Sequence, residues 1–408
     1  MNAVGIDVSK GKSMVAIMRP FGEVVAPPFE VNHTTSEFDK LVNFLKSLDG
    51  ETKVVMEHTG KYSQPIARAL NEAGIFVCLV NALLVHGYNN NSIRQVKTDK
   101  KDAIKIANYG LDRWMELKEY APDNATRQLL KTYNRQCHQY MKVKVALKNN
   151  LISLLDQTFP KANTLFTNRP RKRDGHEKWV DFVARFWHID CVCGLSESVF
   201  IERYNKWCKR HGYYSSDLKA KEIYSGTQEH IAMLPKNDVT KQLITLTVSQ
   251  LNAISETLAT IQREMNHLAS QLPEYPVVMA MQGVGQVFGP QLMAEIGDVE
   301  RFRRKQSLVA FAGIDAPPYQ SGAFEAHSRS ISKRGSPFLR KTLFQVMSCI
   351  MQSSSIDNEI FQYLDKKRSE GKHFYVYMMA GANKFLRIYY ARVKEFLNDD
   401  DKLAETIH

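Results

Sequence analysis

The first 110 residues alternate short apolar runs with amphipathic helical patterns. Five runs predict strands: VGIDVSK, SMVAIMRP, EVVAPPFEV, TKVVME and IFVCLVN. Phe21-Gly22 lies where a hairpin turn would join the second and third of them. Thr34 and Glu37 form a capping box ahead of one helical pattern, and Pro65 to Ala73 predicts another helix, closed by Gly74. This order predicts an α/β domain, a mixed sheet with helices on its faces.

The hydrophobic period then changes to that of two long helices. Apolar positions that step by three and four residues are typical of a coiled-coil seam. The two helices fit an antiparallel hairpin within the chain and pairing with a second protomer equally well. The first seam comprises Leu130, Tyr133, Cys137, Tyr140, Lys144, Leu147, Leu151 and Leu154, and the second comprises Leu251, Ile254, Leu258, Ile261, Met265, Leu268 and Leu272.

Residues 160–235, between the seams, are interpreted as an insertion with a basic loop, NRPRKRDGHEK, and many aromatic residues after it. Arg171, Lys172 and Arg173 in this loop are candidate nucleic-acid contacts, because cations displace the counterions of a polyanion. The spacing of the insertion's histidines and cysteines is not a standard zinc pattern, so ordinary buried cysteines are favoured over a zinc site. That set is His188, Cys191, Cys193, Cys208 and His211.

The last part of the chain predicts a mostly helical region with one irregular loop. Gly283 and Gly285 precede an apolar helix, as in a helix-hairpin-helix turn whose backbone amides hold a phosphate, although a plain turn between helices has the same pattern. Ser336-Pro337 predicts the start of a helix. The expected domains are therefore 1–120, 121–275 with the insertion, and 276–408.

The net charge of the chain predicts the class of its binding partner. The 408-residue chain has a formal net charge of +12, which favours a polyanion, most often nucleic acid. A membrane surface is disfavoured, because no apolar run approaches the ~18 residues of a membrane span and no basic amphipathic helix is evident. The six cysteines form no secreted framework and the N-terminus runs straight into a predicted strand, so we expect a cytoplasmic location.

Four acidic residues fall where strands and a helix could bring them together. Asp7 lies in the first strand, Glu57 ends the fourth, and Asp99 and Asp102 lie three residues apart on a predicted helix. Four carboxylates repel one another unless they bind hard cations such as Mg²⁺. Two such ions ~3.5–4 Å apart clamp the attacking and leaving oxygens of a phosphodiester. For each acid taken singly, a surface or capping role is the alternative.

These blocks resemble a known family. GIDVSK, MEHTG and KTDKKDA are similar to three blocks of the DEDD-type transposases of bacterial insertion sequences, and Piv site-specific DNA invertases resemble the same family. GVGQVFGPQLMAEIGDVERF, LVAFAGIDAPPYQSG and SISKRGSPFLRKTLF resemble that family's C-terminal transposase domain. The resemblance implies a ribonuclease H-like (RuvC-like) first domain, a coiled-coil segment, and a mostly helical C-terminal domain. The insertion has no clear counterpart.

The resemblance also assigns roles. Asp7, Glu57, Asp99 and Asp102 would be catalytic metal ligands for Mg²⁺, with Mn²⁺ as an alternative, and Ser321 would form a covalent phosphoserine with DNA. The metal would come from one protomer and the serine from another, in a dimer or tetramer. A structured guide RNA would pair with the DNA, and the protein would act at the bacterial nucleoid.

A serine hydroxyl is a weak nucleophile until a base or a metal activates it. His327 lies six residues from Ser321 and no histidine is adjacent, so metal activation is the more economical interpretation. Cations downstream are candidates for binding the scissile phosphate and its neighbours. They are Arg329, Lys333, Arg334 and Arg340, and the rival serines are Ser328, Ser330, Ser332 and Ser336.

Three other functions share parts of this pattern. In a metal-dependent junction nuclease, water attacks and Ser321 is structural. A nucleic-acid-binding protein with a decayed active site would need neither the acids nor the serine. A Piv-like invertase acting at one chromosomal site uses the same chemistry as the transposase.

The net charge generates the first testable prediction. Affinity for DNA or RNA should fall steeply with salt, by ~10³-fold between about 50 and 200 mM if about six phosphates are contacted. Fluorescence anisotropy of a labelled DNA across a salt series measures the slope. An affinity that does not change over this range would remove the argument for a polyanionic partner.

Overall fold

The computed structural model describes residues 1–88, 98–121, 124–167, 169–318, 320–321, 324–325, 330–353 and 356–407. The chain divides into two compact units, Met1–Pro122 and Asp123–His408, and each is described by itself. Within the described ranges, no helix combines the length and the apolar character that crossing a membrane requires.

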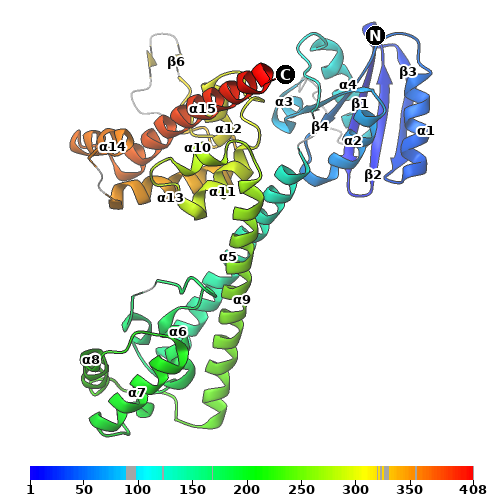
Figure 1. Ribbon diagram of the computed structural model, residues 1–408. Coiled ribbons are helices and arrows are strands. Elements are labelled where there is room, and N and C mark those ends of the chain that lie inside the picture. Colours follow the sequence, from blue (N-terminus) through cyan, green and yellow to red (C-terminus); the bar gives the residue numbers. More distant parts are fainter. Residues whose placement is uncertain are drawn as a thin grey trace. The chain divides into compact units, whose positions relative to one another are not determined.

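The first unit is built on a five-stranded sheet with strand order β3-β2-β1-β4-β5 (Figure 1). β1 pairs antiparallel with β2 and parallel with β4, and β4 pairs parallel with β5. The predicted mixed sheet is therefore confirmed. The strands are β1 (Asn2–Ser9), β2 (Lys12–Met18), β3 (Val24–Asn32), β4 (Thr52–Glu57) and β5 (Phe76–Val80), and 3₁₀ turns span Pro20–Gly22 and Gly60–Tyr62.

Helices cover both faces of this sheet. Val4 and Ile6 of β1 face a core shared with helices α1 (Thr35–Lys46) and α2 (Gln64–Glu72). Helix α4 (Asp99–Asp112) covers the opposite face, and the short helix α3 (Ala82–Gly87) precedes it. A Cβ atom on Gly5 would lie 2.1 Å from the carbonyl oxygen of Ala103 and 2.3 Å from the amide nitrogen of Ala107. Glycine is therefore required where α4 rests on β1.

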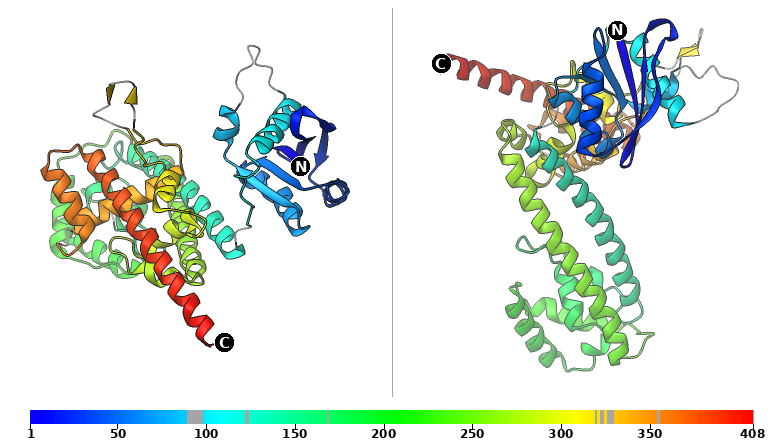
Figure 2. Two further views of the ribbon diagram at one scale, coloured as in Figure 1. Left: turned by 90° about the horizontal axis from the view of Figure 1, so that it is seen from above. Right: turned by 90° about the vertical axis from the view of Figure 1, so that its right-hand side faces the viewer.

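Two long helices form the spine of the second unit. Helix α5 (Ala125–Leu155) and helix α9 (Asp238–Ser270) lie side by side (Figure 2). The start of α5 shares a core with the end of α9, whereas the end of α5 shares a different core with the first half of α9. The seams therefore pair within the chain as an antiparallel hairpin. The polar seam residue Lys144 is explained by Glu177, whose Oε1 lies 3.5 Å from its Nζ.

The insertion forms a small helical body around an aromatic core that it shares with the end of α5 and the first half of α9. That core includes Trp179, Phe182, Phe200 and Tyr204, all fully buried. Cys208 is buried beside them, whereas Cys191 and Cys193 are half-buried. The elements are α6 (Lys178–Arg185), α7 (Glu197–His211) and α8 (Asp217–Thr227), with 3₁₀ turns at Ala162–Thr164 and Ile189–Cys191.

The described residues in the rest of the second unit are mostly helical, as predicted, and include a two-stranded hairpin. Helices from this region pack with the start of α5 and the end of α9 into the largest core of the chain (Figure 1). The elements are α10 (Tyr275–Met279), α11 (Gly285–Ile296), α12 (Lys305–Ala312), β6 (Gln320–Ser321), β7 (Phe324–Glu325), α13 (Pro337–Ser353), α14 (Glu359–Ser369) and α15 (Phe374–Ile407).

One histidine of α5 is buried in a cationic setting. His138 is 6% exposed, and its ring centroid lies 5.0 Å from that of Phe338. Its Nε2 atom has no hydrogen-bond partner among the described residues. Burial lowers the pKa of the imidazole to about 4, and the positive charges of Lys341 and Arg135 add to the effect. His138 is therefore neutral at neutral pH.

The low pKa predicts acid sensitivity of the second unit. Below pH 6.5 the unfolded chain takes up a proton at His138, whereas the folded chain resists it down to about pH 4. The free energy of unfolding should therefore decrease by up to ~3 kcal/mol across this window. His138→Phe keeps a ring against Phe338 and should flatten that part of the pH profile.

Urea unfolding followed by far-UV circular dichroism at several pH values measures the effect. His267 is exposed on α9, so His267→Gln is the matched control and should keep the wild-type profile. If His138→Phe and His267→Gln lose stability equally between pH 6.5 and 4, His138 is not the responsible group.

Candidate active site

Two carboxylates lie together at one edge of the sheet. β1 and β4 are parallel with Ile6 opposite Met56, so the next residues, Asp7 and Glu57, occupy neighbouring positions at the carboxyl ends of these strands. Alternate side chains of a strand share a face. Asp7 therefore shares the face of Gly5, which is the face that α4 covers. Glu57 shares that face through Val55, which contacts α4 at Gly110.

Helix α4 brings the other two carboxylates to the same edge. Asp99 and Asp102 lie in its first turn, where the Thr98 hydroxyl accepts a hydrogen bond from the Lys101 amide at 3.3 Å. Ala103 rests on Gly5, and α4 runs from there toward Gly110 at the amino end of the strands. One turn back from Ala103, Asp99 therefore lies over the carboxyl end of β1. A favourable interaction with the helix dipole is the structural alternative for both acids.

The electrostatics of Lys12 support this placement. Lys12 begins β2, directly after the turn that follows β1. The pKa of its ammonium is raised, chiefly by the hydrogen bond and charge of Glu30, with a smaller contribution from Asp99. Asp99 therefore lies within electrostatic reach of the β1–β2 turn.

The four acids thus share one face and one edge of a single sheet. Asp7, Glu57 and Asp102 are half-buried, and Asp99 is exposed. Within the described residues, no group of three or more His, Cys, Asp or Glu side chains is placed to hold a metal ion. The oxygen atoms of the four acids are of the type that Mg²⁺ and Mn²⁺ prefer, so the donor set fits such an ion.

Ser321 lies in the second unit, on a small hairpin. β6 and β7 pair antiparallel with Ser321 opposite Phe324. Only the backbone of Ser321 is described, and Arg329 lies outside the described residues.

The base of this loop is closed by a backbone clasp. The Ser332 amide donates to the Asp315 carbonyl at 2.8 Å, and the Lys333 amide donates to the Gly313 carbonyl at 3.0 Å. The Ser332 hydroxyl also donates to the Asp315 carboxylate at 2.5 Å. A Cβ atom on Gly335 would lie 2.2 Å from the Phe311 carbonyl oxygen, so the two chain segments touch directly.

The predicted cations divide by their contacts. Arg340 donates from its guanidinium to the Ala312 carbonyl at 3.0 Å and so supports the clasp. Lys333 and Arg334 are exposed beside it. Lys333 has a positive φ of 54°, an unusual conformation for a lysine that the clasp holds in place. These two side chains are accessible to a phosphate.

A buried acid that the sequence interpretation missed anchors the clasp. Glu295 of α11 is 1% exposed and accepts hydrogen bonds from Asn134 Nδ2 at 2.7 Å, Arg135 at 2.9 Å and the Ser336 hydroxyl at 2.9 Å. The Ser336 oxygen also accepts from the Leu339 amide at 3.2 Å, which confirms the predicted cap of α13. An acid inside the apolar run QLMAEIG is the sequence signal that could have revealed it.

The glycine turn between α10 and α11 is confirmed as a turn. Gly283 and Gly285 have φ values of 81° and 56°, where glycine is favoured. A Cβ on Gly283 would lie 2.4 Å from Ile350 Cγ1, whereas Gly285 has open space around it. Phosphate binding at this turn stays a prediction.

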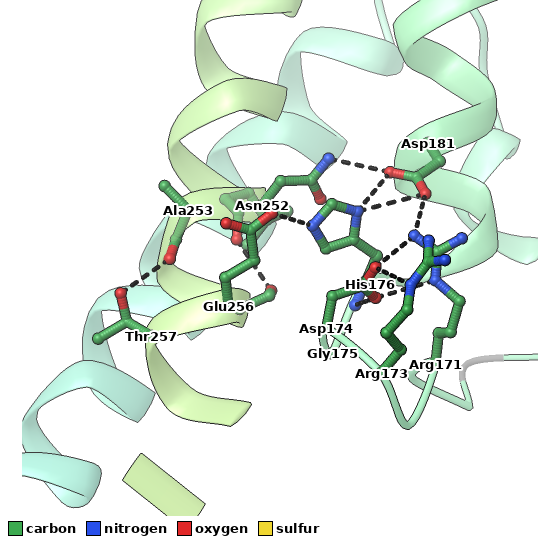
Figure 3. A network of polar contacts seen from close by, with 12 residues as sticks. Arg171, Arg173, Asp174, Gly175, His176, Asp181, Asn252, Ala253, Glu256 and Thr257 are labelled. Atoms are coloured by element: carbon green, nitrogen blue, oxygen red, sulfur yellow. Dashed lines mark hydrogen bonds and ion pairs between the residues drawn. The ribbon is translucent and has the colours of Figure 1, made fainter. Parts of the chain in front are cut away.

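The basic loop of the insertion is tied into the protein by a polar network (Figure 3). Arg171 binds the Asp174 carboxylate through two nitrogens, at 2.9 and 2.6 Å, and donates to the His211 carbonyl at 2.6 Å. His176 bridges Asp181, at 3.1 Å, and Glu256 of α9, at 2.9 Å. Arg171 therefore has a structural role, whereas its neighbours Lys172 and Arg173 are exposed.

Comparisons with known proteins match both the carboxylate-bearing unit and the C-terminal helical region to transposases. Residues 4–160 match a family model, DEDD_Tnp_IS110, described as "Transposase", and residues 275–362 match the "Transposase IS116/IS110/IS902 family". The "Pilin gene-inverting protein" of Moraxella bovis is 22% identical over 352 residues, 86% of this chain and 83% of that protein. The "uncharacterized 44.8 kDa protein" of insertion element IS116 from Streptomyces clavuligerus is 22% identical over 322 residues, 78% of this chain and 77% of that protein.

The matches define the class of protein as a DNA recombinase of the transposase type. More closely, the chain belongs to the transposase family of the insertion elements IS110, IS116 and IS902. The family predicted from the sequence blocks is therefore confirmed. The two matched regions leave residues 161–274 between them, a range that includes the insertion.

The carboxylate edge generates a prediction for Asp99→Asn and Asp102→Asn. Loss of a metal ligand should lower DNA strand cleavage by more than ~100-fold, because substitutions beyond the ligands already cost 10–100-fold. Stability should change by less than ~1 kcal/mol, since only a favourable helix-end charge is lost.

Cleavage of DNA carrying the element ends, with Mg²⁺ present, measures the activity, and thermal unfolding measures the stability. Asp39 is an exposed aspartate on α1, across the sheet, so Asp39→Asn is the control and should cleave normally. Normal cleavage by both α4 variants would show that these carboxylates are not ligands.

Proposed function

We propose that the protein cleaves and rejoins DNA strands with Mg²⁺, through a covalent phosphoserine at Ser321, within an RNA-guided homo-oligomer. The observation that carries the proposal is the gathering of Asp7, Glu57, Asp99 and Asp102 on one face of the carboxyl edge of the sheet. The strand order β3-β2-β1-β4-β5 supports a ribonuclease H-like, RuvC-like fold for this unit.

The carboxylates would hold the metal, and Mn²⁺ could replace Mg²⁺ there. A bound divalent ion supplies charge stabilisation at phosphoryl oxygens and acidifies a coordinated hydroxyl. The protein's own residues then act on the strand. The Ser321 oxygen forms a bond to phosphorus and loses its proton, the bond from phosphorus to the 3′ oxygen breaks, and that oxygen leaves as a hydroxyl. The phosphoester energy is kept in the adduct, so a 3′ hydroxyl can rejoin without ATP.

The cations near the clasp would hold the DNA. Lys333 and Arg334 are exposed where the loop carrying Ser321 returns to the helical core. Charge-assisted contacts from such side chains position a phosphate next to a nucleophile. Arg329 is proposed for the same role on sequence grounds alone. The buried Glu295 anchors Ser336, just after Lys333 and Arg334. The backbone from which these two cations extend is therefore held in place.

Site-specific inversion is the second candidate function. The relative from Moraxella bovis is named for inverting a pilin gene and aligns with 86% of this chain. Inversion and transposition use the same cleavage and rejoining, so the site supports both. A junction nuclease, in which water attacks and a free 5′ phosphate results, is the rival that the chemistry of the ends distinguishes.

The serine generates the sharpest prediction of the proposed function. Incubation with matched DNA and Mg²⁺, followed by denaturation, should trap a protein–DNA adduct that protease removes. Ser321→Ala should form no adduct and no recombinant while still binding nucleic acid, because only the nucleophilic oxygen is lost.

Ser330→Ala is the matched control, since Ser330 is an exposed serine from the same loop and should leave the adduct intact. Gel analysis of the ends with and without protease gives the answer. Recombination by Ser321→Ala would show that Ser321 is not the nucleophile, and ends that are protein-free throughout, without recombinant product, would replace the recombinase proposal with the nuclease.

A further inference from the structure

The insertion carries an open pocket that the catalytic proposal does not use. Its volume is ≈ 650 Å³, within the range of ligand sites, and its lining comes from four segments of the insertion. Cations and aromatic rings dominate the lining: Arg169, Lys178, Lys219, Phe166, Tyr213 and Tyr214. Arg171 contributes as well, and the lining contains no acidic side chain.

Lys178 is held at the centre of the aromatic group. Its ammonium lies 4.9 Å from the Phe166 ring centroid and 5.5 Å from that of Tyr213, and it donates to the Tyr214 carbonyl at 2.8 Å. Burial lowers the pKa of Lys178, and the nearby charge of Lys219 lowers it further. A desolvated ammonium beside a second cation favours an anionic ligand.

The other cations differ in how far they are neutralised. Lys219 pairs with Glu222 at 2.8 Å, and Arg171 pairs with Asp174, so acids outside the lining offset these two. Arg169 is exposed and makes no hydrogen bond or ion pair with any part of the chain that the structure describes. Arg169 and Lys178 therefore supply the positive charge that remains for a ligand.

Tyr214 provides a flat apolar surface at the same place. It is 87% exposed, although its neighbour Tyr213 is half-buried and fixed by a hydrogen bond to Asp181 at 2.6 Å. Phe166 is also half-buried at the pocket. Exposed aromatic faces beside cations are the means by which proteins bind single-stranded nucleic acid, since bases stack on the rings while phosphates contact the cations.

We infer that this pocket binds an unpaired nucleotide of a single-stranded nucleic acid, with the base on the aromatic rings and the phosphate near Arg169 and Lys178. A duplex does not fit the inference, because its bases are stacked on one another and offer no free face. Lys172 and Arg173 are exposed on the same loop and continue the positive charge beyond the pocket, which favours a strand over a free mononucleotide. The inference stands apart from the cleavage chemistry.

Binding of the full-length protein to a labelled ten-nucleotide oligouridylate and to the matching oligodeoxythymidylate tests the pocket at fixed salt. Tyr214→Leu should weaken binding by about tenfold, and Tyr214→Phe should restore it, because stacking needs the ring and not the hydroxyl. Arg169→Gln should weaken binding by a similar factor. Arg203→Gln, an exposed arginine on α7 outside the pocket, is the matched control and should bind normally.

Cross-linking locates the contact directly. Oligomers carrying 5-iodouracil should cross-link under ultraviolet light to the peptides that contain Phe166 or Tyr213 and Tyr214, as mapped by mass spectrometry. Comparison of the RNA and DNA probes identifies which strand the pocket takes.

Three results would overturn the inference: cross-links found only elsewhere in the chain, equal losses for Arg169→Gln and Arg203→Gln, or equal competition by uridine monophosphate. Neither binding nor cross-linking requires catalysis, so such a failure leaves the proposed strand cleavage untouched. Conversely, an inactive Ser321 would not affect these measurements.

Discussion

The close approach of α4 to β1 at Gly5 is the constraint on which the candidate active site depends. Backbone lies on backbone there, because a single Cβ atom would overlap Ala103 and Ala107. This contact fixes the height of α4 above the sheet and the position of its first turn over the strand ends. The first turn of α4, which carries Asp99 and Asp102, therefore lies over the carboxyl ends of the strands that carry Asp7 and Glu57.

In the second unit, a buried charge helps to fix the position of the loop that carries Ser321. Glu295 joins α5, α11 and the start of α13 through three hydrogen bonds. Removing one partner from such a network leaves a buried charge poorly satisfied, which is costly. The clasp at Asp315 and Ser332 then holds the ends of the loop that carries Ser321. Both units thus place candidate site residues on segments whose ends are fixed by packing in the interior.

Much of this was predictable from the sequence, for a physical reason. Strand and helix periods, the cap at Thr34 and the glycine turn are local signals, and the structure follows them. The choice between an intramolecular hairpin and a dimer for the two seams was not predictable, because both bury the same residues. The partners of Glu295 could not be found either, since Asn134 lies 161 residues away along the chain. The pocket at Tyr214 could not be predicted either, because its lining residues come from separate segments of the chain.

The pairing of α5 with α9 sets the distance between the core of the C-terminal helices and the core of the insertion. Leu130 packs in the core of the C-terminal helices, and Leu151 packs in the core of the insertion. The 21 residues that separate these leucines in one continuous helix span about 32 Å at 1.5 Å per residue. The length of the hairpin therefore sets the distance between the two cores. A nucleic-acid strand that contacted the protein surface over both cores in a stacked conformation would need about nine or ten nucleotides at 3.4 Å each. The length of α5 would then set how many stacked nucleotides separate contacts at the two ends of this unit.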